Sequence, residues 1–227
     1  MSNSITSQGT AHPGRYKVMI VDDHPIVRFG LGQMINREPD MEVCGEADGV
    51  VDALRQIEAS RPDVIVIDLS LGSEDGIELI EHAKARWSTM KILVSSAHDE
   101  QTYAGRVLRA GAMGYISKHE PMSMVVAAIR QVLGGEVYLS PEMATAMLQR
   151  AAVGKTLDGD PVATLSNREL QVFKMIGQGL STIEIAHKLE LSPKTVESHR
   201  KVIKVKLNLA NGPQLNRHAF QWIQEGH

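Results

Sequence analysis

The sequence predicts an α/β domain with a five-stranded, doubly wound parallel sheet, followed by a small all-α domain. From residue 17 to about residue 133, short apolar runs alternate with longer segments of helical periodicity. The expected strands are residues 17–21, 41–46, 64–67, 91–95 and 114–116. The run VIVI at 64–67 is apolar throughout, which is typical of a strand buried on both faces. Beyond residue 163, helix-start signals recur and no strand is expected.

The chain is expected to divide into four segments. Residues 1–15 are polar, with Arg15 as their only charge, and are expected to form a disordered tail. Residues 16–135 form the α/β domain, whose fifth helix ends at Gly134-Gly135. Residues 136–163 form a linker with a short helix near 142–151 and an aperiodic stretch at 153–163. Residues 164–227 form the all-α domain.

The composition is that of a globular protein with no membrane span. The chain is 43% hydrophobic and 22% charged. Its longest apolar stretches are roughly five to seven residues, far below the roughly 20 needed to cross a bilayer. The single cysteine, Cys44, excludes an internal disulfide and a cysteine-rich zinc site. No secretory signal is recognisable, and a cytoplasmic location without membrane contact is expected.

The charge is distributed unevenly between the two expected domains. Residues 164–227 hold nine Lys and Arg against five Asp and Glu, a net charge of +4. Because the whole chain carries −3, residues 1–163 carry −7. This asymmetry indicates that the carboxyl-terminal domain binds an anion.

Polar residues follow the apolar runs of four expected strands. They are Asp22 with Asp23, then Asp68, Ser96 and Lys118. The carboxyl ends of parallel strands lie along one edge of the sheet, so these side chains are expected to converge. Carboxylates favour Mg²⁺, a lysine can hold a phosphoryl oxygen, and a hydroxyl can donate a hydrogen bond to another. The pattern predicts a site that transfers a phosphoryl group to Asp68.

Each of these residues also has a structural explanation when taken alone. Asp23 could cap the first helix, and Asp68 could be a turn residue. Ser96 could be a loop hydroxyl and Lys118 a solvated charge. Their joint position at strand ends, with an Asp-Gly turn expected at residues 75–76 after Asp68, favours the functional interpretation.

Residues 17 to about 135 resemble a receiver domain of two-component signalling. The resemblance rests on DDHPIVRFGL, VIVIDLSLGSEDGIEL, SSAHDE and GAMGYISK, which occur in the usual order. It implies a flavodoxin-like fold, phosphorylation of Asp68 by a histidine kinase, and sensing of the phosphoryl group by Ser96 and Lys118. It implies that Tyr115 is the switch residue, which turns inward when the hydroxyl residue moves. It also implies a Mg²⁺ site formed by Asp22, Asp23, Asp68 and the backbone carbonyl of Ser70.

One segment departs from the receiver pattern. Many receivers have Pro-Gly where this chain has Gly72-Ser73, and glycine gives the loop more backbone freedom. Ser70 and His98 occupy places that resemble family positions tuning dephosphorylation. The loop after Asp68 is therefore expected to be more mobile than usual, and the lifetime of the phosphorylated state stays open.

The carboxyl-terminal segment contains three helix-start signals. Ser166 with Glu169 and Ser181 with Glu184 match the S-x-x-E capping box, and Ser192 precedes Pro193 at a first helical position. The segment TIEIAHKLELSPKTVESHRKVIKVKL is expected to form a helix, a turn of about four residues and a longer helix. The longer helix has an apolar stripe formed by Val196, Ile203 and Leu207.

The opposite face of this longer helix is polar and could enter the major groove of DNA. Its residues follow the spacing i, i+3, i+4, i+7: Lys194, Glu197, Ser198 and Lys201. Residues 193–206 hold five Lys and Arg and one acid, enough charge for several phosphate contacts. A solvated helix face is the alternative explanation.

The segment from LSNREL to KVKLNL resembles the four-helix LuxR-type helix-turn-helix module, and the whole chain resembles a NarL/FixJ-family response regulator. The resemblance implies binding of double-stranded DNA, a cognate histidine kinase, and dimers favoured by phosphorylation, which also frees the recognition helix from the receiver. RNA polymerase is a further candidate partner. Base contacts are implied for Glu197, Ser198 and Lys201, and backbone contacts for Lys188, Lys194, Thr195, His199 and Lys206.

Many relatives carry lysine at the Glu197 position, whereas an acid there could accept a hydrogen bond from a cytosine amino group. The chain is interpreted as a transcription regulator that catalyses only its own phosphorylation and dephosphorylation. One alternative is a phosphatase with an aspartyl-phosphate intermediate, but such sites require a second acid two residues after the nucleophile, where this chain has Ser70. The others are a receiver acting only through protein contacts and a regulator that works without phosphorylation.

Overall fold

The computed structural model describes residues 14–72, 74–152 and 161–224. The expected α/β domain is present and contains a five-stranded parallel sheet with the strand order β2-β1-β3-β6-β7. The strands are β1 (Tyr16–Val21), β2 (Met41–Ala47), β3 (Val64–Ile67), β6 (Lys91–Ser96) and β7 (Gly114–Ser117). All five expected strands are confirmed to within a residue or two at their ends.

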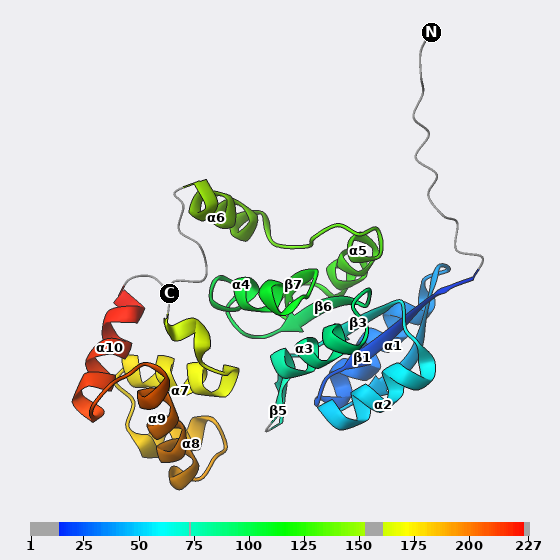
Figure 1. Ribbon diagram of the computed structural model, residues 1–227. Coiled ribbons are helices and arrows are strands. Elements are labelled where there is room, and N and C mark those ends of the chain that lie inside the picture. The colour runs from blue at the N-terminus through cyan, green and yellow to red at the C-terminus, as the bar shows by residue number, and fades with distance from the viewer. Residues whose placement is uncertain (1–13, 73, 153–160, 225–227) are drawn as a thin grey trace.

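Helices cover both faces of this sheet (Figure 1). One face packs against α1 (Pro25–Arg37) and α5 (Met122–Leu133), and the other against α2 (Val50–Ser60), α3 (Gly76–Arg86) and α4 (Glu100–Ala110). All four residues of β3 are buried, as expected for the central strand of a sheet covered on both sides. Packing on both faces therefore fixes the sheet, and with it the edge where its strands end.

A two-stranded hairpin follows β3 and was not expected from the sequence. Its strands β4 (Ser70–Leu71) and β5 (Glu74–Asp75) are antiparallel. Gly72 has a positive φ of 61° within the hairpin, a conformation that glycine adopts without steric cost. The expected turn at Asp75-Gly76 is instead a helix start, because the Asp75 side chain accepts a hydrogen bond from the Ile77 amide and caps α3.

The linker contains the expected short helix, α6 (Pro141–Ala152). Residues 153–160 of the expected aperiodic stretch at 153–163 lie outside the described residues. The end of this stretch, expected to be loop, forms the 3-10 helix η2 (Pro161–Thr164). Arg15, assigned to the tail, donates hydrogen bonds to the carbonyls of Asn36 and Glu38. The other tail residues 1–13 lie outside the described range.

The carboxyl-terminal part is all-α, as expected. It contains α7 (Asn167–Gly177), α8 (Thr182–Lys188), α9 (Pro193–Lys206) and α10 (Gly212–Gln224). Both predicted capping boxes are present at the starts of α7 and α8, and Ser192 caps α9. The apolar stripe of α9 is buried, and Trp222 of α10 packs edge-on against Phe173, with 5.8 Å between ring centroids. No helix in the described stretches has both the length and the apolarity to cross a membrane.

Candidate functional site

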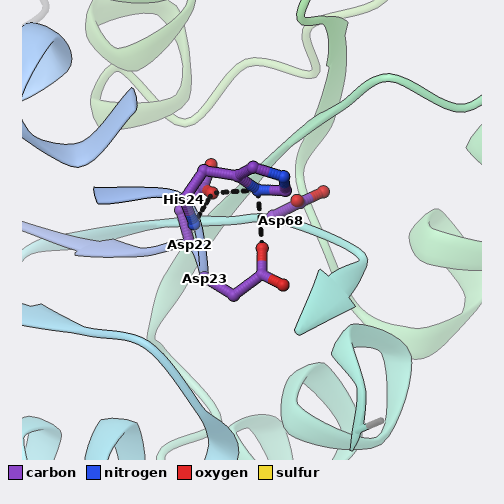
Figure 2. Close-up of side chains that lie close together, drawn as sticks. All are labelled: Asp22, Asp23, His24 and Asp68. Atoms are coloured by element: carbon purple, nitrogen blue, oxygen red, sulfur yellow. Dashed lines mark hydrogen bonds and ion pairs between the residues drawn. The ribbon is translucent and has the colours of Figure 1, made fainter. Parts of the chain in front are cut away.

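Three aspartates that are far apart along the chain gather at the carboxyl ends of β1 and β3 (Figure 2). Asp22 and Asp23 follow β1, and Asp68 follows β3. Asp22 and Asp68 are 4% and 3% exposed. One side-chain ligand atom from each of Asp22, Asp23, His24 and Asp68 lies within 4.8 Å of the others. The predicted convergence of these acids is therefore present in the structure.

Lys118, just after β7, lies between the two buried acids. Its Nζ is 2.6 Å from Oδ2 of Asp22 and 2.7 Å from Oδ2 of Asp68. Burial by itself would lower the pKa of Lys118, but Asp68 and Asp22 more than offset this and raise the pKa above its ordinary value. Lys118 therefore keeps its positive charge next to the candidate phosphoacceptor.

The two carboxylate oxygens of Asp68 differ in their hydrogen bonding. Oδ2 accepts the hydrogen bond from Lys118, whereas Oδ1 is buried and has no hydrogen-bond partner within the described part of the chain. Burial raises the pKa of Asp68 above its ordinary value, and the charge of Lys118 opposes this shift only in part. A buried, unpartnered carboxylate oxygen is costly unless it receives a cation or a donor. The donor set, which is rich in carboxylate oxygens, fits Mg²⁺.

His24 is a member of this cluster that the sequence interpretation did not include. Its Nδ1 is 2.6 Å from Oδ1 of Asp23 and 3.2 Å from Oδ1 of Asp22. His24, rather than Asp23, is the N-cap residue of α1, and its side chain makes no capping hydrogen bond. The other oxygen of Asp23, Oδ2, accepts a hydrogen bond from the amide of Gly72 at 2.9 Å. The capping role considered for Asp23 is therefore not its role here.

Ser96 is the last residue of β6 and Tyr115 the second residue of the neighbouring strand β7, and both are fully buried. The Ser96 carbonyl accepts a hydrogen bond from the amide of Lys118 at 2.8 Å. The Tyr115 hydroxyl donates to the carbonyl of His98 at 2.6 Å, and burial raises its pKa. The Tyr115 ring is therefore buried in this structure, and its role as the switch residue stays a prediction.

Ser70 and His98 contact each other directly. Ser70 Oγ is 2.9 Å from Nε2 of His98, whose ring stacks on Tyr103 with 4.8 Å between centroids. Burial lowers the pKa of His98 to about 4, and the charges of Lys174 and Arg168 add to this shift. The imidazole is therefore neutral at pH 7.

The polar face of α9 is exposed as predicted. The exposed candidates are Lys188 on α8 and Lys194, Glu197, Ser198, Lys201 and Lys206 on α9. Lys206 is nevertheless engaged within the domain, because its Nζ lies 2.7 Å from Oε2 of Glu169 and 3.2 Å from the Thr164 carbonyl. Thr195 and His199 are half-buried and line a cavity of about 420 Å³ between α9 and the β4–β5 hairpin. Most of the predicted DNA contacts thus lie on an exposed face, and Lys206 is held there by an ion pair.

The family resemblance implied that the receiver holds the DNA-binding domain, but the sequence did not indicate which residues make the contact. The Asp75 carboxylate accepts hydrogen bonds from the backbone amide of Asn167 at 2.8 Å and from its Nδ2 at 2.6 Å. Arg168 donates to the Gly72 carbonyl at 2.8 Å. Gln171 Nε2 lies 3.0 Å from His98 Nε2. We call this the docked arrangement, in which the start of α7 contacts the hairpin that follows Asp68. The capping box identified where α7 starts but gave no sign of its partner across the domains.

Comparison with known proteins agrees with this two-domain organisation. Residues 18–130 match the family model "Response regulator receiver domain", and residues 163–219 match "Bacterial regulatory proteins, luxR family". The oxygen regulatory protein NreC of Staphylococcus carnosus (strain TM300) is 36% identical over 210 residues, covering 90% of this chain and 97% of that protein.

Two solved structures of RcsB are also similar to this chain. One is RcsB of Salmonella enterica serovar Typhimurium bound to promoter rprA with the phosphomimetic BeF3⁻, which is 26% identical with a TM-score of 0.56 and covers 91% of this chain and 98% of that chain. The other, of two RcsB dimers bound to two parallel DNAs, is 25% identical with a TM-score of 0.56 and covers 90% of this chain and 97% of that chain. The chain belongs to the NarL/FixJ family of response regulators, transcription regulators that join a receiver domain to a LuxR-type DNA-binding domain.

Proposed function

We propose that Asp68 accepts a phosphoryl group from a histidine kinase and that this modification controls DNA binding by α9. Residues 16–135 are the receiver, residues 136–163 the linker and residues 164–227 the DNA-binding domain in this proposal. The observation that carries it is the buried Asp68 carboxylate, which has an unpartnered Oδ1 and a lysine 2.7 Å from Oδ2. We place the protein in the cytoplasm, where a histidine kinase presents its phosphorylated domain.

The transfer needs a carboxylate oxygen of Asp68 to attack the phosphorus of a phosphohistidine. A phosphorus–oxygen bond forms, the phosphorus–nitrogen bond breaks, and the electron pair stays on the imidazole nitrogen, which then takes a proton. Lys118 supports this step because its ammonium group can leave the two aspartates and bind an oxygen of the arriving phosphoryl group. Ser96 lies at the end of the adjacent strand and can donate a hydrogen bond to another oxygen.

The acids would also hold the cofactor. Asp22, Asp23, Asp68 and the backbone carbonyl of Ser70 would bind Mg²⁺, which supplies positive charge that offsets repulsion between the carboxylate and the phosphoryl oxygens. Asp23 can contribute because its Oδ1 contacts the exposed His24 and its Oδ2 accepts from the backbone amide of Gly72, contacts that a metal ion could replace. His24 has a side chain that is 60% exposed, so it can move aside without unfolding α1.

The surroundings of the site suit a protein donor. Ile26 and Phe29 on α1 are 81% and 66% exposed, a few residues after the acid pair. Exposed apolar side chains next to a site indicate a surface for protein contact. We assign this part of α1 to kinase docking.

DNA binding is assigned to the exposed face of α9, with Lys188 of α8 as a further phosphate contact. Glu197, Ser198 and Lys201 would face bases, and Lys194 would contact the backbone. Thr195 and His199 join them only when the receiver leaves the cavity that they line. Lys206 would have to give up its pair with Glu169, so we rank it below the others.

The docked arrangement would therefore restrain DNA binding until the site is phosphorylated. RcsB binds DNA as dimers in one of its solved structures, and released chains of this protein would likewise pair as dimers on DNA. RNA polymerase is a candidate partner of the DNA-bound dimer. The proposal treats the chain as a signalling protein whose only turnover is that of its own phosphoryl group.

Labelling with radioactive acetyl phosphate and Mg²⁺ tests the acceptor. The wild-type chain should take up acid-stable, hydroxylamine-labile label, and Asp68→Asn should take up none. Asp52→Asn is the matched control, since this half-buried aspartate of α2 lies outside the acid cluster and should leave labelling unchanged. Label that persists on Asp68→Asn would contradict the assignment, and turnover of free phosphomonoesters would favour the phosphatase alternative.

A further inference from the structure

Glu197 is held in place by a residue of the neighbouring helix. Its Oε1 accepts a hydrogen bond from Oγ1 of Thr182, the first residue of α8, at 2.6 Å. Arg200 Nε, one turn further along α9, lies 3.7 Å from the same oxygen. Among the described residues, no hydrogen bond or ion pair reaches the other oxygen, Oε2. One side of this carboxylate is anchored, and the other is free to accept.

A purely structural role for the contact between Thr182 and Glu197 does not explain two observations. The packing of α8 against α9 already rests on the buried side chains of Ile185 and Val196, each 0% exposed. A hydrogen bond between groups at the surface adds little to such a packed pair. Meanwhile the Glu197 side chain is 60% exposed, on the face that also carries Lys194, Ser198 and Lys201. The contact therefore fixes the direction of an exposed carboxylate more than it stabilises the domain.

A carboxylate that reaches the major groove can only accept hydrogen bonds. Guanine presents the acceptors N7 and O6 there, and thymine presents O4, so both repel Glu197. Adenine presents a donor at N6 but also the acceptor N7 beside it, whereas cytosine presents its N4 donor without an adjacent acceptor. Cytosine is thus the base edge that best matches an anchored carboxylate.

We propose that Glu197 selects cytosine at one base pair of each operator half-site and that Thr182 is its positioning residue. The inference rests on the proposed function, because it needs α9 in the major groove. The lysines on either side, Lys194 and Lys201, offset the repulsion between this carboxylate and the DNA phosphates. Anchoring by Thr182 removes rotamer freedom before binding, so less conformational entropy is lost when the base contact forms.

Selection from a random DNA library, with the full chain in Mg²⁺ and beryllofluoride, tests the inference. The wild-type chain should enrich a motif in which one position prefers cytosine over guanine by about tenfold or more. Glu197→Gln should move that position toward adenine, because glutamine pairs with N6 and N7 of adenine. Glu197→Ala should lose the preference at that position alone. Thr182→Val should weaken it several-fold with an unchanged melting temperature.

Two controls separate this inference from its foundations. Glu190→Gln removes the same charge from the turn between α8 and α9 and should leave the motif unchanged. Lys201→Ala should weaken binding while the Glu197-dependent position keeps its cytosine. An identical base preference in wild type and Glu197→Ala would overturn the inference while DNA binding stands. Failure of the wild-type chain to enrich any DNA would overturn the proposed function, and this inference with it.

Discussion

Replacing Asn167 by alanine should shift the chain out of the docked arrangement. Asn167 is 3% exposed, and its Nδ2 donates a 2.6 Å hydrogen bond to the carboxylate of Asp75 across the two domains. Its backbone amide donates to the other oxygen of that carboxylate and is retained in the variant. The substitution therefore removes one charge-assisted hydrogen bond and leaves the cap of α7, which Ser166 provides, in place.

The size of the effect follows from that one bond. A hydrogen bond to a charged group contributes about 1.5–3 kcal/mol. Since 1.4 kcal/mol corresponds to a factor of ten, the ratio of docked to released chains should fall by about 10- to 150-fold. The apparent affinity of a chain for DNA scales with its released fraction. The unphosphorylated variant should bind DNA more tightly by up to this factor, until released chains predominate.

Fluorescence anisotropy with a selected operator measures this change. The affinity gain should appear in the unphosphorylated chain and disappear in Mg²⁺ and beryllofluoride, where both proteins are released. Asn36→Ala is the matched control, because it removes a hydrogen bond within the receiver, from the Val43 amide, without touching the domain contact. Equal affinities of wild type and Asn167→Ala in the unphosphorylated form would refute the reasoning.

Four further outcomes are expected. Gly76→Ala should destabilise the receiver by at least about 1–3 kcal/mol in urea unfolding, because the added Cβ would lie 2.4 Å from the Asp68 carbonyl oxygen. Lys118→Met should cost about 3 kcal/mol by leaving buried carboxylates unpaired, and Mg²⁺ should restore more stability to this variant than to wild type. Lys201→Ala should change the base preference of DNA binding while the slope of its salt dependence stays nearly constant, as expected for a base contact, and a slope reduced by about one unit would make Lys201 a phosphate contact instead. Phe29→Asp should slow transfer from a kinase while labelling by acetyl phosphate stays at the wild-type rate, and equal loss of both would place the defect in the site itself.

Features set by local chemistry could be predicted from the sequence. Strands β1, β3 and β6 were visible because each contains a short apolar run, and VIVI of β3 is buried at every position. The capping boxes at Ser166 and Ser181 could be predicted because donor and acceptor lie three residues apart. The convergence of the aspartates followed from topology, since parallel strands end at one edge. None of these inferences needed knowledge of a distant contact.

Features that depend on distant partners could not be predicted. The β4–β5 hairpin has strands of two residues, too short to show a period of two. Asp75 has the composition of a turn residue, and only the fold brings it to Asn167, 92 positions away. Lys206 has the composition of a phosphate contact, and its pair with Glu169 depends on how α7 packs against α9. Propensity is informative for elements, but the partners of polar groups are set by the tertiary structure.

Two of the groups that join the two domains also contact residues at or beside the acid site. Gly72 donates its amide to Asp23 and accepts from Arg168 at its carbonyl, and Nε2 of His98 contacts both Ser70 and Gln171. If Oδ2 of Asp23 turns toward a cation, its hydrogen bond from the Gly72 amide weakens. Gly72 can then shift, which changes the position of its carbonyl relative to Arg168. Coupling between two binding events is reciprocal. Whatever factor bound beryllofluoride and Mg²⁺ contribute to DNA affinity, operator DNA must therefore contribute the same factor to the affinity of the site for beryllofluoride and Mg²⁺.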